Sequence, residues 1–253
     1  MSLKLHIDVK ILALTLCVLP VLLSLGFWQL NRAEEKRTIQ TAFEKQKKRS
    51  PMTWRAIENI KAQKNEKAQL AFLPVTLTGE FDRKQTFLLD NKIYQGKVGY
   101  QVLQPFLIQK EKQWVLINRG WIAAPRTREE KPIVPQPAIG TTTLQAEVYV
   151  PPGEAYKLDE QNYGQVTWPL VIQNVEIEKI SQLLNKSFFQ YEIRLQETDA
   201  NILQTNWQPI SVQPEKHVAY AFQWFAMATG LILWFIFAST NVWQVITRRS
   251  ESY

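Results

Sequence analysis

Two long apolar segments lie near the ends of this 253-residue chain, separated by a stretch of mixed polar and apolar sequence. Residues 11–31 contain no Asp, Glu, Lys or Arg, and the interval from Val218 to Thr247 lacks them too. About 20 helical residues, each rising about 1.5 Å, span the roughly 30 Å hydrocarbon core of a bilayer. The pattern therefore predicts transmembrane helices at 11–31 and 220–245, with short tails at 1–10 and 246–253.

The first apolar segment has a second interpretation, a cleaved signal peptide. Ser24 and Gly26 are small residues at a spacing that a signal peptidase accepts. The apolar run is longer, however, than the usual signal core of about 7 to 15 residues, and it continues without a breaker into residues 27–32. We therefore favour a retained span, in which neighbouring helices would satisfy the backbone group that Pro20 leaves free.

Between these segments, the spacing of apolar residues predicts a soluble α+β domain at 32–219. Residues 33–49 include many good helix formers, so the first helix should continue out of the membrane as a stalk until Pro51 ends it. Residues 54–63 place apolar side chains three to four positions apart, which predicts a short amphipathic helix. Another helix is expected at 176–184.

Alternating apolar and polar positions in the same domain predict a mostly antiparallel β-sheet. Gly96 and Gly99 indicate a hairpin connection at 91–100. The stretch Asn118-Arg-Gly-Trp121 follows the most apolar run and is interpreted as a polar turn, while four prolines at 123–143 predict an extended surface loop. The expected strands are 75–81, 87–89, 100–102, 114–117, 144–150 and 189–195.

The few cysteines and histidines narrow the chemistry that the domain can support. Cys17, the only cysteine, lies in the first apolar segment, and His217 is the only histidine between the two segments. A structural zinc site needs about four nitrogen or sulfur ligands, and a Ser-His or Cys-His hydrolase needs a base inside the domain, so neither can form away from His217. The sequence has no phosphate-binding glycine motif. Scattered carboxylates leave a membrane-anchored hydrolase open as an alternative.

The net charge of +7 does not indicate a nucleic acid partner. The densest basic cluster, at 45–49, follows a membrane span, so solvent or lipid headgroups are its expected neighbours. Charge leaves the topology open: the Lys and Arg residues around the first segment favour a cytoplasmic domain, whereas Arg248 and Arg249 favour the reverse. Residues 1–10 contain no arginine and are unlike a mitochondrial presequence, which favours a bacterial origin.

A candidate binding face begins at His217 in the second apolar segment. Tyr220, Ala221, Trp224 and Ala228 follow it at helical spacing, so the face is aromatic with two small gaps. Helix packing with an interfacial aromatic belt explains this face, and composition favours that explanation. The alternative is a flat macrocycle lying on the face, with neutral His217 as an axial iron ligand.

The first apolar segment adds residues to this candidate site. Because the first span exits and the second enters on the same membrane side, Trp28, Gln29 and Arg32 should reach the same depth as His217. Arg32 would suit a carboxylate such as a haem propionate, although snorkelling to headgroups is its ordinary behaviour. The candidate cofactor-binding residues are Trp28, Arg32, His217, Tyr220, Gln223 and Trp224.

Four separated motifs of this chain resemble, in order, those of the Surfeit locus protein 1 family. The resemblance implies a non-enzymatic assembly factor for cytochrome c oxidase or a related haem-copper terminal oxidase. It also implies an anchor in the inner membrane, with the soluble domain on the periplasmic side and both termini in the cytoplasm of a bacterial cell. No motif matches in much of 122–216. The matching motifs are Leu25–Arg32 with Lys36, Gly99–Val102 with Pro105, Asn118–Trp121 and His217–Phe225.

The resemblance further implies that the chain handles haem a, with His217 as the candidate iron ligand. The oxidase's large subunit and the machinery that supplies haem a are the expected partners, beside membrane lipid. Since each chain supplies one such histidine, the iron would be five-coordinate, completed by a small ligand, or shared in a homodimer. A scaffold that binds oxidase subunits without haem is the alternative, with Tyr100, Arg119 and Trp121 as its candidate contacts because Arg and aromatic residues dominate interface hot spots.

Overall fold

The computed structural model describes residues 8–127, 130–151, 166–210 and 212–240. It contains two compact units, which are described separately. The helical unit comprises Met1–Thr41 and Gln208–Tyr253, and the sheet unit comprises Ala42–Trp207.

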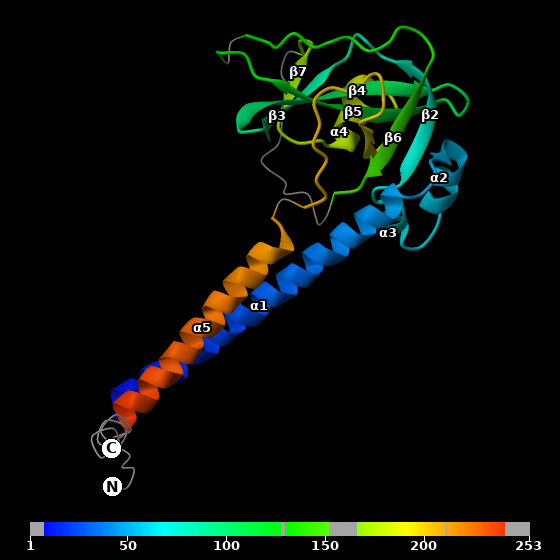
Figure 1. Cartoon of the computed structure of the whole chain (residues 1–253). Coiled ribbons are helices and arrows are strands. Elements are labelled where there is room, and N and C mark those ends of the chain that lie inside the picture. The colour runs from blue at the N-terminus through cyan, green and yellow to red at the C-terminus, as the bar shows by residue number, and fades with distance from the viewer. Residues whose placement is uncertain (1–7, 128–129, 152–165, 211, 241–253) are drawn as a thin grey trace. The chain divides into compact units, whose positions relative to one another are not determined.

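The described residues of the helical unit contain two helices, α1 (Val9–Lys47) and α5 (Pro214–Ser239), and α1 continues beyond the boundary of the unit. Figure 1 shows α5 running alongside α1. By length and composition both are apolar enough to cross a membrane, and side chains such as Leu16 and Phe222 are exposed on them. A membrane would remove this apolar surface from water.

The observed helices agree with the predicted span and stalk at the N-terminal end. The predicted span at 11–31 and most of the stalk at 33–49 form one continuous helix, α1. The second predicted span begins inside α5, which starts six residues before 220 and ends at Ser239. The rest of that span and the tail at 246–253 lie outside the described residues, as do residues 1–7 of the first tail.

Small residues allow close packing in the helical unit. Ala221 and Ala228, the two gaps in the predicted face, are both buried. A Cβ atom on Gly26 would lie only 2.6 Å from a ring carbon of Phe225, so glycine is needed at this contact. The rings of Phe27 and Phe225 meet edge to face with centroids 5.3 Å apart. Helix packing therefore accounts for the small residues of α5, as their composition indicated.

An eight-stranded sheet dominates the sheet unit, in the order β1-β2-β6-β8-β5-β4-β3-β7. The pairs β2–β4, β2–β6, β3–β4, β4–β5 and β6–β8 are antiparallel, which confirms the predicted mostly antiparallel sheet; β1–β2, β3–β7 and β5–β8 are parallel. The strands are β1 (Met52–Thr53), β2 (Pro74–Phe81), β3 (Phe87–Tyr94), β4 (Lys97–Ile108), β5 (Gln113–Ala123), β6 (Thr142–Tyr149), β7 (Leu170–Ile172) and β8 (Phe188–Leu195).

The sheet closes on itself because β4 pairs with β2 as well as with β5. Gly79 of β2 lies opposite Ile108 of β4, and Phe81 lies opposite Phe106. The five strands β2, β6, β8, β5 and β4 therefore form a closed ring, in which every strand pairs with two other strands of the ring. A closed sheet has an inside, and the larger hydrophobic cluster includes residues of all five ring strands.

The described residues of the sheet unit also form three short helices: α2 (Trp54–Lys61), α3 (Glu66–Leu70) and α4 (Ile177–Leu184). The first and last of these match the predicted helices. Trp54 and Ile57 of α2 belong to the larger cluster, whereas Ile177 and Ile180 of α4 pack with Phe87 in a second cluster. The predicted α+β class is confirmed. The described part of 124–141 contains no helix or strand, as the prolines there predicted.

The prediction for Asn118–Trp121 as a turn was wrong. These residues lie within β5, which continues to Ala123. The ladder with β4 is irregular between Val102 and Leu103, and Gly120 has a φ of +114°. An irregularity of this kind re-aims side chains inside a strand and gives it a turn-like composition.

Candidate functional site

His217 lies at the start of α5, where Pro214 occupies the first turn. Proline is favoured there because its missing N–H would have no helical partner. The imidazole Nδ1 lies 2.7 Å from the side-chain oxygen Oε1 of Gln29 on α1. The other ring nitrogen, Nε2, is buried and has no hydrogen-bond partner among the described residues. The helix pair thus holds one imidazole by one nitrogen and leaves the other unused.

The other predicted site residues of α1 form a separate pair. The guanidinium of Arg32 lies 5.7 Å from the ring centroid of Trp28, and its Nη1 lies 2.6 Å from a carboxylate oxygen of Glu35. Both members of the ion pair are about half exposed, so the pair contributes little to stability and exchanges readily with solvent. The sequence argument placed Gln29 beside His217 correctly in depth.

The remaining candidates lie on α5 with different exposures. Tyr220 and Gln223 are exposed, and Trp224 is half-buried. Among the described residues, the recorded polar and ring contacts join His217 to Gln29 and Trp28 to Arg32, but they do not join these two pairs. These contacts do not test the predicted six-residue set as a haem site, which stays a prediction.

Among the described residues, His217 could supply a single nitrogen ligand to a haem iron. Within the described ranges, no group of three or more His, Cys, Asp and Glu side chains could hold a metal ion. A haem iron brings four ring nitrogens with it, so one protein ligand is enough. A buried imidazole nitrogen without a partner is the donor that this arrangement requires.

The closed ring of strands in the sheet unit is a barrel, and Arg119 joins two loops to its interior. Its Nε donates to the carbonyl of Asn201 at 2.9 Å, and its Nη1 donates to the carbonyl of Pro135 at 2.6 Å and to Oε1 of Gln104 at 2.8 Å. Burial lowers the pKa of the Arg119 guanidinium to about 10, although Asp199 opposes this shift. Three acceptors aimed at one buried cation indicate a structural anchor.

Backbone contacts of the same motif fasten the segment that follows β8. The backbone N–H of Trp121 donates to Gln204 at 2.6 Å, and Leu203 N–H donates to the carbonyl of Arg119 at 2.6 Å. A Cβ atom on Gly120 would lie 2.7 Å from the Gln204 carbonyl oxygen. Glycine therefore serves two needs at position 120, the positive φ and the close approach of a second backbone.

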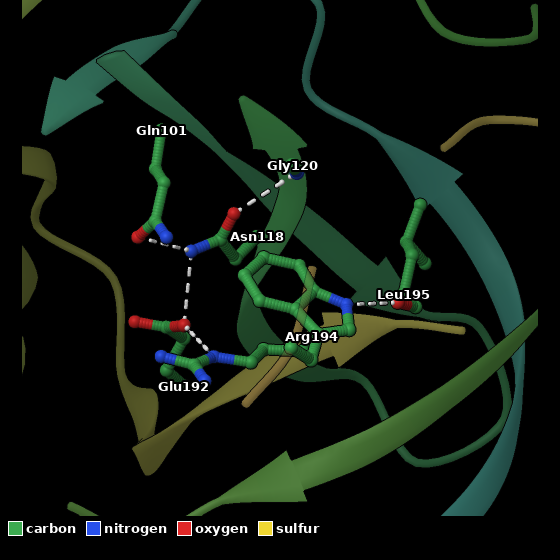
Figure 2. A network of polar contacts seen from close by, with 7 residues as sticks. Gln101, Asn118, Gly120, Glu192, Arg194 and Leu195 are labelled. Carbon is green, nitrogen blue, oxygen red and sulfur yellow. Dashed lines mark hydrogen bonds and ion pairs between the residues drawn. The ribbon is translucent and has the colours of Figure 1, made fainter. Parts of the chain in front are cut away.

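Asn118 is the centre of a polar network on β4, β5 and β8, shown in Figure 2. Its amide donates to Gln101 at 3.1 Å and to Glu192 at 3.0 Å, while its side-chain oxygen accepts from the N–H of Gly120 at 3.0 Å. Arg194 donates to the same carboxylate oxygen of Glu192 at 2.8 Å. One carboxylate therefore satisfies both an amide and a guanidinium.

Aromatic rings enclose Arg194 at the edge of this network. Its guanidinium carbon lies 3.2 Å from the ring centroid of Tyr149 and 4.7 Å from that of Trp207. Trp207 in turn donates from its indole N–H to the carbonyl of Leu195 at 2.8 Å. Burial lowers the pKa of the nearby Lys92 ammonium, and the charge of Glu192 opposes that shift. Sequence spacing gave no signal for this network, because its members come from separate strands.

The predicted contact patch of Tyr100, Arg119 and Trp121 is not a surface. Their exposed fractions are 8%, 2% and 6%. The indole N–H of Trp121 donates to the Lys92 carbonyl at 2.9 Å, and its ring lies 5.3 Å from that of Tyr94. Residue types that dominate interfaces are also suited to cores, so composition did not distinguish the two roles.

Comparison with known proteins identifies the family. Residues 16–229 match the family model described as the SURF1 family. The chain belongs to the SURF1 family. It is similar to a SURF1-like protein of Rickettsia felis, with 26% identity over 235 residues, which are 89% of this chain and 95% of that protein. A SURF1-like protein of Rickettsia bellii is 27% identical over 229 residues, 84% of each chain.

Membership in the SURF1 family confirms the resemblance inferred from the four motifs. The matched range contains Gln29, Arg119 and His217. SURF1 proteins are known as cytochrome c oxidase assembly factors and are not a known enzyme family.

Proposed function

We propose that this SURF1-family chain is a membrane-anchored assembly factor for cytochrome c oxidase that holds haem a through His217. In this proposal the haem is held for insertion into, or stabilisation in, the large subunit of the oxidase. The observation that carries the proposal is the Nε2 atom of His217, which is buried and has no hydrogen-bond partner among the described residues.

A buried polar atom without a partner is unfavourable by about 1–3 kcal/mol. Such an atom is expected where a partner binds only part of the time. Haem, if bound, would supply an iron atom that the Nε2 atom of His217 could hold. The exposed rings of Trp28 and Tyr220 offer apolar surface to a porphyrin, with Gln223 and Trp224 on the same helix as Tyr220. Arg32, whose present partner is the exposed Glu35, would pair with a propionate.

The proposal includes a location and partners but no catalytic step. Both helices would cross the bacterial inner membrane, with the sheet unit on the periplasmic side and both termini in the cytoplasm. The large subunit of the oxidase and the source of haem a would be the partners. A homodimer that shares one haem is included in this proposal, because each chain supplies one such histidine.

An absorption spectrum tests the proposal. The chain, purified in detergent from cells that make haem a, should show a Soret band that is lost or strongly weakened in His217→Ala. The matched control is Gln40→Ala, which changes a polar residue of α1 away from the proposed site. A Soret band of the same position and intensity in His217→Ala would remove His217 as the ligand.

A scaffold that binds oxidase subunits without haem is the second candidate. Two isoleucines in the proline-rich loop favour it, because Ile133 and Ile139 are 94% and 81% exposed. Ile93 and Val98 form another exposed pair on the β3–β4 hairpin. Exposed aliphatic groups of this kind occur at protein contacts.

Crosslinking distinguishes the scaffold from the haem carrier. A photoreactive residue at Ile133 or Ile139 should capture an oxidase subunit even when haem a synthesis is blocked, if the scaffold is correct. Capture that requires haem a, together with a Soret band dependent on His217, would support the haem carrier instead.

A further inference from the structure

The contact between His217 and Gln29 determines which nitrogen of the imidazole carries the proton. A neutral imidazole has one N–H and one nitrogen with a free lone pair. The side-chain oxygen of Gln29 faces Nδ1 at 2.7 Å, and a carbonyl oxygen only accepts hydrogen bonds. With the Gln29 amide in this orientation, Nδ1 is the donor, which leaves the lone pair on the buried Nε2.

We propose that Gln29 is a positioning residue, which fixes the tautomer and ring orientation of His217 so that Nε2 is ready to bind iron. This inference rests on the proposed function, since the ligand of Nε2 is taken to be haem iron. Hydrogen bonds from the second nitrogen of a ligating histidine set its orientation and increase its basicity toward the metal. No other side chain among the described residues forms a hydrogen bond with the His217 ring.

Helix packing keeps Gln29 in reach of His217. Gly26 lies three residues before Gln29, on the same face of α1, and packs against the ring of Phe225. Ala33, four residues after Gln29, is buried as well. On α5, Ala221 lies one turn after His217 and is also buried. Because small residues lie on either side of the pair, the two helices are close where the hydrogen bond forms.

An ordinary hydrogen bond between membrane helices is the competing explanation. Such bonds stabilise helix association only weakly and need no ligand. That explanation predicts that Gln29 matters only for helix association. The positioning role predicts in addition that Gln29 controls the tautomer of the free protein and the affinity and potential of the bound haem.

The tautomer can be measured without haem. Nitrogen NMR of the full-length chain in detergent, carrying His6→Gln so that His217 is the only histidine, should show Nδ1 protonated and Nε2 unprotonated. Gln29→Leu should convert a large fraction to the other tautomer, whereas Gln29→Glu, which keeps an acceptor oxygen, should retain the first one. Protonated Nε2 in the unsubstituted site, or an unchanged tautomer ratio in Gln29→Leu, would overturn the positioning role.

Haem titration completes the test. With purified haem a as the probe, Gln29→Leu should raise the dissociation constant by about 10- to 100-fold, which is the usual effect of removing such a partner. Gln29→Glu should bind within a few-fold of the unsubstituted chain and shift the midpoint potential to more negative values. Gln40→Leu, the same chemical change about 16 Å further along α1, should alter neither quantity.

The two experiments separate the inference from the function on which it rests. If haem binds but its affinity and potential are the same in Gln29→Leu, the positioning role fails and the haem carrier stands. If His217 shows the expected tautomer but no haem binds, the haem carrier fails. If Gln29→Leu does not fold, as judged by helicity, the unsubstituted tautomer and the potential of Gln29→Glu decide the outcome.

Discussion

Two charged side chains in the sheet unit show how differently a barrel accommodates burial. Arg119 is surrounded by acceptors, and each of its hydrogen bonds goes to a different part of the chain. Glu147 is buried on β6 opposite Arg194 in the β6–β8 ladder. Burial raises the pKa of the Glu147 carboxyl to about 7, although Arg194 and Lys47 oppose the shift and Glu197 adds to it. Burial disfavours the charged form of both side chains, but with a pKa of about 10 Arg119 stays charged at neutral pH, whereas Glu147 titrates near it.

Removing Arg119 should destabilise the sheet unit. Arg119→Ala leaves buried acceptors on Gln104, Pro135 and Asn201 without their donor, which we expect to lower the free energy of unfolding by about 3 kcal/mol or more. Arg119→Lys should recover only part of the loss, because an ammonium cannot reproduce the planar fork of a guanidinium. Denaturant unfolding of the full-length chain in detergent, followed by tryptophan fluorescence, measures the change. The exposed Arg126→Ala is the control, and equal stabilities of the two alanine variants would contradict the anchor role.

Glu147 should make the sheet unit less stable as the pH rises. Its carboxyl has a folded pKa of about 7 against an ordinary value of 4.5, so the folded state holds the extra proton between these values. Stability from this group is unaffected below about pH 4.5, falls as the pH rises to about 7, and is constant above, with a total loss of up to about 3 kcal/mol.

Glu147→Gln tests this pH dependence. The amide does not titrate, so the variant should gain stability over the unsubstituted chain as the pH rises from 5 to 8. The difference between their unfolding free energies at each pH isolates this group from the other carboxyls. An exposed glutamate, Glu130→Gln, provides the comparison. A difference that stays constant between pH 5 and 8 would show that Glu147 has no raised pKa.

At the level of elements, regular spacing of apolar residues predicted the longer helices and strands, but it did not predict the short ones. The amphipathic helix beginning at Trp54 and the hairpin around Gly96 follow from patterns that repeat over several residues. The helix α3 and the strands β1 and β7 have five, two and three residues, too few to show a period. Long-range pairing, rather than local preference, holds such short elements in place.

Two glycines with positive φ allow the cost of a strained backbone to be compared with the cost of a close steric contact. At Gly96, in the β3–β4 turn, a Cβ would meet nothing within 4 Å, whereas at Gly120 it would meet the Gln204 carbonyl. Gly96→Ala should therefore lower the free energy of unfolding only by the cost of a left-handed backbone conformation, about 1–2 kcal/mol. Gly120→Ala should lower the free energy of unfolding by several kcal/mol and detach the segment after β8 from β5.

Stability and amide exchange together check the glycine comparison. The denaturant midpoint gives the loss in each variant, and the protection of the Leu203 and Trp121 amides reports on the contact between β5 and that segment. Protection should fall in Gly120→Ala and persist in Gly96→Ala. Equal losses in the two variants would mean that the approach of Gln204 does not constrain position 120.

At the scale of the whole molecule, the arrangement of the chain across the membrane can be tested with single cysteines. In a Cys17→Ser background, Lys110→Cys places a thiol on the exposed turn between β4 and β5, and Asp8→Cys places one before α1. If the sheet unit is periplasmic, an impermeant maleimide should label the first in intact spheroplasts and the second only after permeabilisation. The opposite pattern would reverse the proposed topology.

The amino-acid sequence was enough to predict the two apolar helices, the α+β class, most of the strands and the family. These features depend on local composition, on periods of two or 3.6 residues and on motifs that are contiguous in the chain. Even the juxtaposition of Gln29 and His217 could be anticipated in depth, because two spans of one chain must have ends on a common side.

Three features became known only once the fold was seen: the closure of the barrel, the burial of Arg119 and Trp121, and the contact of Gln29 with His217. Each depends on which residues meet across separate elements, and composition does not specify such meetings. Arginine and tryptophan are favoured both at interfaces and in hydrogen-bonded interiors, so their burial had to be observed.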